Sequence, residues 1–103
     1  MKEGVYMKYL KDRHPGEFLK NELMIPLKIT QYKVAKSLDV PQIYISEIVR
    51  EKRNISQEIG LMLDKFFGFS EGYFSRLQHH YDLLKTKQKL KKKLSEIETY
   101  QQI

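Results

Sequence analysis

The sequence predicts an all-α fold of five helices whose last helix is extended at its C-terminal end. Apolar residues recur three and four positions apart along most of the chain, which is the period of a helix buried on one face. Residues that start or stop helices separate these stretches. A chain of 103 residues with 41% hydrophobic residues is large enough for one core. We expect an N-terminal arm over residues 1–13, a helical core over 14–69 and a C-terminal helix with a basic tail over 70–103.

The first helix is expected after the arm, whose apolar residues show no regular helical spacing. Proline is tolerated in a first helical turn, so the helix begins around His14 and Pro15. Phe18, Leu19 and Leu23 then share the face toward the core. Because Pro26 disfavours helical geometry at the residue before it, the helix should end near Ile25.

Residues 30–50, TQYKVAKSLDVPQIYISEIVR, predict two short helices packed against each other. Thr30 is a good N-cap, and Asp39 stands at the turn position where glycine commonly supplies a positive φ, a region that Asp tolerates. The apolar positions match the skeleton of a helix-turn-helix, in which the second helix enters the major groove: Val34, Ala35, Leu38, Val40, Ile45 and Ile48. The alternative is an ordinary helical hairpin with no nucleic-acid role.

The second of these helices, about residues 41–50, is the predicted recognition helix. The side chains expected to contact bases are Gln42, Ile43, Tyr44 and Glu47, although an ion pair within the chain is an equal alternative for Glu47. Gln can offer a donor and an acceptor to adenine, and Ile can contact a thymine methyl group. The side chains expected to contact phosphates are Thr30, Gln31, Lys33, Ser46, Arg50, Lys52 and Arg53.

Two further helices are predicted beyond the recognition helix. Ser56 caps a helix that buries Ile59 and Leu63 and stops at Gly68. Ser70 and Glu71 open the last helix, and a stripe of apolar residues along it continues through Leu90, Leu94 and Ile97. This helix carries an apolar seam that is predicted to pair two copies of the chain, formed by Phe74, Leu77, Tyr81 and Leu84. The alternative is that the seam packs on its own domain.

The charge of the chain favours polyanionic partners. Nineteen Lys and Arg against thirteen Asp and Glu give a net charge of +6, and residues 85–93, KTKQKLKKK, hold six lysines and no acid. This lysine run either lies along phosphates or forms a solvated helix face. The chain has no cysteine and shows neither a secretory signal nor an apolar run long enough for a bilayer, so we expect a cytoplasmic protein with no membrane partner.

The sequence gives no sign of an enzyme, a metal site or a cofactor. It has no glycine-rich phosphate loop, no GxSxG elbow and no cysteine nucleophile. His79 and His80 are neighbours, and on a helix their side chains diverge by about 100°, so one metal ion does not suit both.

Three segments together resemble the HigA-type bacterial antitoxins, which have a phage-repressor-like helix-turn-helix. They are HPGEFLKNEL at 14–23, the block from Thr30 to Ser56, and GYFSRLQHHYDL at 72–83. The resemblance implies a homodimer that binds double-stranded operator DNA at an inverted repeat, neutralises a HigB-type toxin that cleaves messenger RNA, and represses the shared operon. Glu51 departs from the family pattern, because a glycine is common there. The alternatives are a stand-alone phage-type regulator and a protein-interaction module that no longer reads DNA.

Overall fold

The computed structural model describes residues 13–101, and these residues are all-α, with no strand among them. The predicted fold class is confirmed. The helical elements are α2 (Pro15–Phe18), η1 (Leu19–Met24), α3 (Ile25–Leu27), α4 (Gln31–Leu38), α5 (Gln42–Val49), α6 (Gln57–Phe67), α7 (Tyr73–Lys89) and α8 (Lys91–Ser95). The predicted arm lies outside the described residues apart from Arg13, which is exposed.

The first helical stretch runs without a break through α2, η1 and α3. It begins where predicted, with His14 as its N-cap, but it passes Pro26 and ends at Leu27, two residues beyond the predicted end near Ile25. The reason is the π-helical hydrogen bonding of η1, in which the Ile25 N–H bonds to the Lys20 carbonyl five residues back. Lys28 adopts a left-handed φ of 55° and closes the stretch.

The helices α4 and α5 form the predicted pair. The Thr30 hydroxyl accepts a hydrogen bond from the Lys33 N–H at 3.0 Å, which caps α4. Asp39 ends α4 with φ 56° and ψ 49°, the left-handed conformation expected at that position. Val34, Ile45 and Ile48 have no exposed surface, so the apolar skeleton read from the sequence faces the core.

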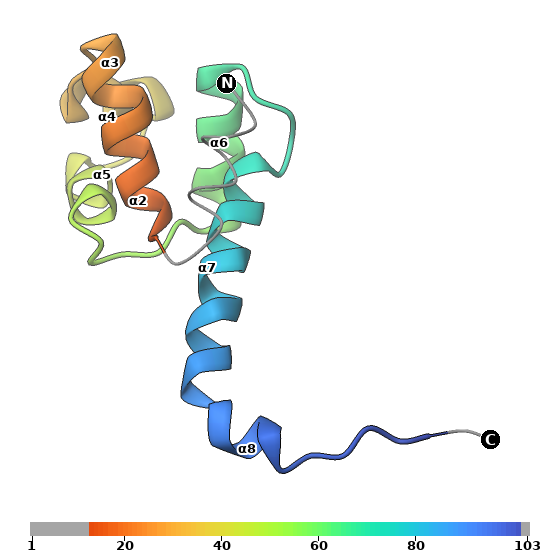
Figure 1. The fold of residues 1–103 in the computed structure, drawn as a ribbon. Helices are drawn as coiled ribbons and strands as arrows, with labels where there is room; N and C mark the ends of the chain where they lie inside the picture. The colour runs from red at the N-terminus through yellow and green to blue at the C-terminus, as the bar shows by residue number, and fades with distance from the viewer. Residues whose placement is uncertain (1–12, 102–103) are drawn as a thin grey trace.

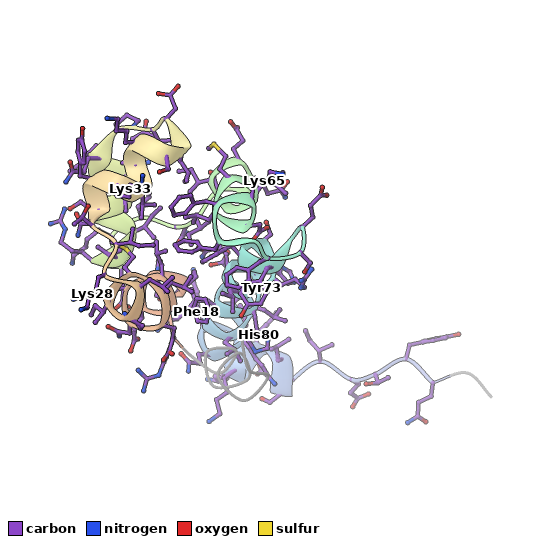
Figure 2. All side chains as sticks on the ribbon, turned by 90° about the horizontal axis from the view of Figure 1, so that it is seen from above. Phe18, Lys28, Lys33, Lys65, Tyr73 and His80 are labelled. Carbon is purple, nitrogen blue, oxygen red and sulfur yellow. The ribbon has the colours of Figure 1, made fainter. Side chains whose placement is uncertain are left out.

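The helices α6 and α7 complete the core. Ser56 caps α6 and Gly68 ends it, as predicted, while α7 begins at Tyr73, later than the predicted opening at Ser70 and Glu71. Asp64 determines this start, because its buried carboxylate accepts hydrogen bonds from the N–H groups of Gly72 at 2.9 Å and Phe74 at 3.0 Å. Phe18 and Tyr73 lie between α2 and α7 with their rings 5.8 Å apart (Figure 2).

The helix α2 lies between α5 on one side and α7 on the other (Figure 1). Beyond this core α7 continues alone, a break at Leu90 separates it from α8, and the last described residues lead away from the body. The described chain is therefore elongated, with extents of 56 × 26 × 21 Å. The predicted helical stripe through Leu90 and Leu94 is interrupted at Leu90, and Ile97 lies past the end of α8.

Candidate nucleic-acid interface

The N-terminal half of α5 presents its outer face to solvent. Gln42 is exposed and Ile43 is 52% exposed, whereas Ile45 and Ile48 on the inner face are fully buried. Because α5 has only eight residues and one buried face, its outer surface is short and well defined. A helix held in this way can insert its outer side chains into a major groove.

Tyr44 and Glu47, on the same helix, are both held by Arg53. The Arg53 guanidinium lies 4.0 Å from the centre of the Tyr44 ring, and its Nε and Nη2 atoms are each 2.8 Å from Glu47 Oε1. This geometry corresponds to the alternative that the sequence left open for Glu47. The three side chains tie the segment after α5 to the helix, and one oxygen of Glu47 is already in use.

The residues predicted to contact phosphates surround this surface. Lys33, Arg50 and Lys52 are exposed, and Figure 2 shows Lys33 on α4. Gln31 and Ser46 are half-buried, and the Ser46 carbonyl accepts a hydrogen bond from Arg50 Nε at 3.3 Å. The Thr30 hydroxyl is an N-cap acceptor and keeps its own proton to donate. The cations therefore flank α5 from α4 and from the segment that follows α5.

Gly16 fixes the distance between α2 and α5. A Cβ atom at this position would lie 1.8 Å from the Ile48 carbonyl oxygen, far inside any normal contact. Only glycine permits the two backbones to approach this closely. The sequence pattern HPGE signals a helix start but does not reveal this contact, which joins residues 32 positions apart.

A polar cluster around the buried His14 links the two motifs that flank the helix-turn-helix. His14 Nδ1 accepts a hydrogen bond from the Gly16 N–H at 2.9 Å, and its Nε2 lies 3.3 Å from the Asn54 side-chain oxygen. These partners require the neutral Nε2–H tautomer. The Tyr81 ring meets the imidazole edge-on at 5.0 Å. Burial lowers the pKa of His14, and the Asn54 hydrogen bond and the nearby Glu51 and Asp82 carboxylates oppose that shift.

Gln78 extends this cluster to the segment after α5. Its side-chain oxygen accepts a hydrogen bond from the buried Ile55 N–H at 2.7 Å, and its amide donates to Asp82 at 2.9 Å. The segment that carries Arg50, Lys52 and Arg53 is thus anchored to α7 from behind. Glu51 turns in this segment with φ 62°, the conformation that a glycine would adopt without strain.

Comparison with known proteins assigns this arrangement to a family. The chain matches the helix-turn-helix family over residues 20–74. It is 39% identical over 70 residues to virulence-associated protein I of Dichelobacter nodosus, and the match covers 68% of this chain but 65% of that relative, which is less than two thirds of its length. The Pseudomonas aeruginosa antitoxin HigA, solved with the higBA promoter, has a TM-score of 0.82 and 30% identity, covering 88% of this chain and 100% of that one.

An addiction module antidote protein of the HigA family from Coxiella burnetii has a TM-score of 0.79 and 33% identity, covering 87% of this chain and 99% of that one. The chain belongs to the helix-turn-helix family and is of HigA type. This family comprises DNA-binding regulators and not enzymes, in agreement with the sequence-based expectation.

In this HigA-type chain, part of the predicted dimerisation seam is internal. Phe74 is 0% and Leu77 is 1% exposed, so the prediction that these two side chains meet a second copy is wrong. They pack in the chain's own core, where Phe74 meets Phe18 with their rings 5.9 Å apart. Tyr81 and Leu84 are half-buried and keep part of their surface free. Burial on the same chain competes with burial on a partner, and helical spacing cannot tell the two apart.

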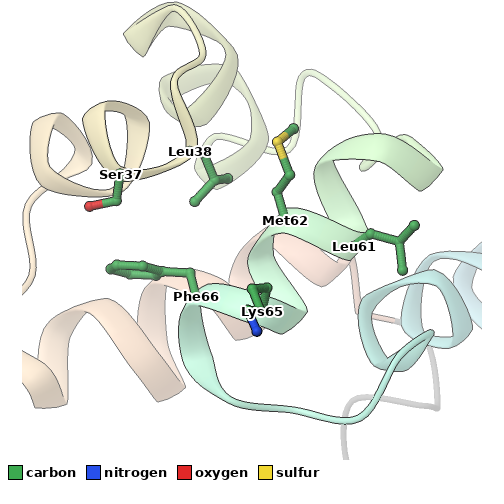
Figure 3. Close-up of a pocket in the computed structure, with 6 residues that line it drawn as sticks. All are labelled: Ser37, Leu38, Leu61, Met62, Lys65 and Phe66. Carbon is green, nitrogen blue, oxygen red and sulfur yellow. The ribbon is translucent and has the colours of Figure 1, made fainter.

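An open apolar groove of about 410 Å³ lies between α4 and α6 (Figure 3). Its lining residues are Ser37, Leu38, Leu61, Met62, Lys65 and Phe66. None of the predicted site residues lines it. Residues 13–101 contain no group of three His, Cys, Asp or Glu side chains arranged to hold a metal ion, and no helix among them is long and apolar enough to cross a bilayer.

Proposed function

We propose that this HigA-type chain is a sequence-specific DNA-binding antitoxin. It neutralises a HigB-type toxin that cleaves messenger RNA and, as a dimer, represses the operon that encodes both proteins. The observation that carries the DNA-binding part is the exposed outer face of α5, with Gln42 and Ile43 free and cations on both flanks. The related Pseudomonas aeruginosa antitoxin HigA, solved with its promoter, supports the same use of the fold.

Gln42 and Ile43 are the proposed principal base readers. Both lie in the first turn of α5, where Gln42 is exposed and Ile43 is 52% exposed. Gln42 suits bidentate recognition of adenine, and Ile43 suits the thymine methyl group. Tyr44 and Glu47 are proposed as secondary base readers, because Arg53 already contacts both side chains. When Tyr44 and Glu47 contact bases, either their contacts with Arg53 persist in the complex or contacts with DNA replace them.

Phosphate contacts position the helix and supply most of the affinity. Lys33 and Gln31 approach the DNA phosphates from the start of α4, where the Thr30 hydroxyl caps the first turn. Arg50, Lys52 and Arg53 approach from the opposite end, on the segment anchored by Gln78. Two sets of contacts at the two ends of the reading surface fix both the register and the tilt of α5.

Dimerisation is proposed through the part of α7 that leaves the core. Tyr81 and Leu84, three residues apart on one face of α7, are half-buried and provide the free apolar surface for this contact. Two recognition helices about 34 Å apart would meet successive major grooves and read an inverted repeat. Replacing Leu84 by Ser should therefore produce monomers in sedimentation and weaken operator binding, whereas a variant that stays dimeric contradicts this interface.

The DNA-binding proposal is tested by fluorescence anisotropy with a duplex from the region upstream of the chain's own gene, competed with unrelated DNA. Gln42→Ala should reduce the preference for the upstream duplex by about tenfold, because a good bidentate contact contributes about 1–3 kcal/mol of discrimination. Gln57→Ala is the matched control, since Gln57 is an exposed glutamine in the first turn of α6. Equal preference in wild type, Gln42→Ala and Gln57→Ala would exclude base reading by Gln42.

The antitoxin part is tested by co-expression with the neighbouring reading frame. The product should co-purify with this chain, and its cleavage of messenger RNA should stop when the chain is added. If the chain reads its promoter but neither binds nor inhibits that product, the alternative of a stand-alone phage-type regulator holds.

A further inference from the structure

The exposed end of α7 and the short helix α8 form a basic rod that the helix-turn-helix does not use. Residues 85–93 contribute six lysines: Lys85, Lys87, Lys89, Lys91, Lys92 and Lys93. All of these are exposed, and the rod lies beyond the core formed by α2, α5, α6 and α7 (Figure 1). Its only acidic neighbours along the chain are Asp82 and Glu96, at its two ends.

The lysines of the rod are electrostatically uncompensated. Within residues 13–101 the ion pairs join Arg13 to Glu17 and Arg53 to Glu47, and neither involves the rod. Lys85 lies 5.5 Å from the centre of the Tyr81 ring, which leaves the ammonium positively charged. Gathering six like charges without partners costs free energy, and a polyanion would remove that cost.

The spacing of the charges identifies the kind of polyanion. The lysines lie on the end of α7 and on α8, on either side of the break at Leu90, and at a helical rise of about 1.5 Å per residue each of the two pieces carries one positive charge for about every 1 to 2 Å. Duplex DNA carries one negative charge for about every 1.7 Å of its axis. The rod therefore matches a nucleic-acid backbone.

We propose that residues 85–93 form a second, sequence-independent contact with the phosphate backbone of nucleic acid, in addition to the reading surface on α5. The inference rests on the proposed DNA-binding function and extends it. The rod increases affinity for any duplex by releasing counterions, while α5 supplies the preference for the operator. Its contribution is strongly salt-dependent, and it holds the protein on DNA that lacks the operator.

The test measures anisotropy of the full chain with the upstream duplex and with an unrelated duplex of equal length, each at several salt concentrations. The variant is Lys89→Gln/Lys92→Gln, which spares Lys85 and its contact with Tyr81. The control is Lys20→Gln/Lys65→Gln, two exposed lysines on η1 and α6 whose loss gives the same net charge. A Lys89→Arg/Lys92→Arg variant retains the charge of the rod.

We expect the slope of log affinity against log salt to become shallower by about 1 to 2 for the rod variant on both duplexes, since each lost phosphate contact removes about 0.9. The ratio of the two affinities should not change. The control and the arginine variant should keep the wild-type slope. A rod variant that keeps the wild-type slope, or that loses no more than the control, overturns the inference.

The two proposals fail in different ways. If wild type binds both duplexes equally and the rod variant weakens both, the inference stands and reading by α5 fails. If wild type prefers the upstream duplex and the rod variant has an unchanged slope, reading by α5 stands and the inference fails. If the rod variant instead loses only co-purification of the neighbouring gene product, the rod is a protein-binding surface and the inference is overturned.

Discussion

Replacing Gly16 by alanine should perturb the position of the recognition helix without touching any proposed DNA contact. The added Cβ would lie 1.8 Å from the Ile48 carbonyl oxygen and 2.7 Å from its carbon, against an ordinary contact distance of at least 3.4 Å. The backbones of α2 and α5 must therefore separate by about 1.6 Å, from 1.8 Å to 3.4 Å. Both obstructing atoms belong to the backbone, so no rotamer change relieves the clash.

The expected cost follows from overpacking. Forcing one extra carbon into a packed interior destabilises proteins by about 1–3 kcal/mol, and occasionally by more. The rigid obstacle puts Gly16→Ala at the upper end, a loss of about 3 kcal/mol in the free energy of unfolding. Small domains are stable by about 5–15 kcal/mol, so the variant should still fold. Operator affinity should fall as well, because α5 carries Gln42 and Ile43.

Gly60→Ala is the matched control for this variant. Gly60 is also buried in a helix, but its nearest neighbour would be the Ser75 side-chain oxygen at 3.3 Å, which can rotate. Alanine gains about 1 kcal/mol of helix propensity over glycine, so this change should be close to neutral. Urea denaturation of wild type and both variants measures the difference. If Gly16→Ala is as stable as Gly60→Ala, the close approach of α2 and α5 does not exist.

Three further variants probe the hydrogen bonds of His14, the cap made by Asp64 and the backbone conformation of Glu51. Because burial lowers the pKa of His14, the unfolded chain takes up the proton more readily, so stability is complete above about pH 6.5 and decreases as the pH falls below it. Urea midpoints from pH 7.5 to 5.5 should show this decrease in wild type, and a flatter profile in His14→Gln. Asp64→Asn should lower the free energy of unfolding by about 2 kcal/mol. The carboxylate accepts hydrogen bonds from the N–H groups of Gly72 and Phe74, and in the variant one of these donors would face the amide nitrogen. Unchanged thermal unfolding would contradict this capping role. Glu51→Gly should raise the unfolding free energy by about 1 kcal/mol by removing a left-handed strain at φ 62°, and a loss of stability would show that no such strain is present.

The sequence alone determined the features that depend on local chemistry. The periods of three and four residues placed Val34, Leu38, Ile45, Ile48, Ile59 and Leu63 in the core, where the structure has them. Capping residues located the starts of α4 and α6, and a turn position tolerant of positive φ was recognised at Asp39. Each of these depends on neighbours within about one or two helical turns, so the order of residues contains the information.

Only the tertiary structure decided which partner each surface meets. Spacing put Phe74 and Leu77 on an apolar face, but packing of α7 on α2 and α6 turned that face inward. The same holds for Arg53, whose position between Tyr44 and Glu47 depends on the path of the segment after α5. The contact of Gly16 with Ile48 also belongs here. Each joins atoms whose separation is set by the whole core, which helical periodicity does not encode.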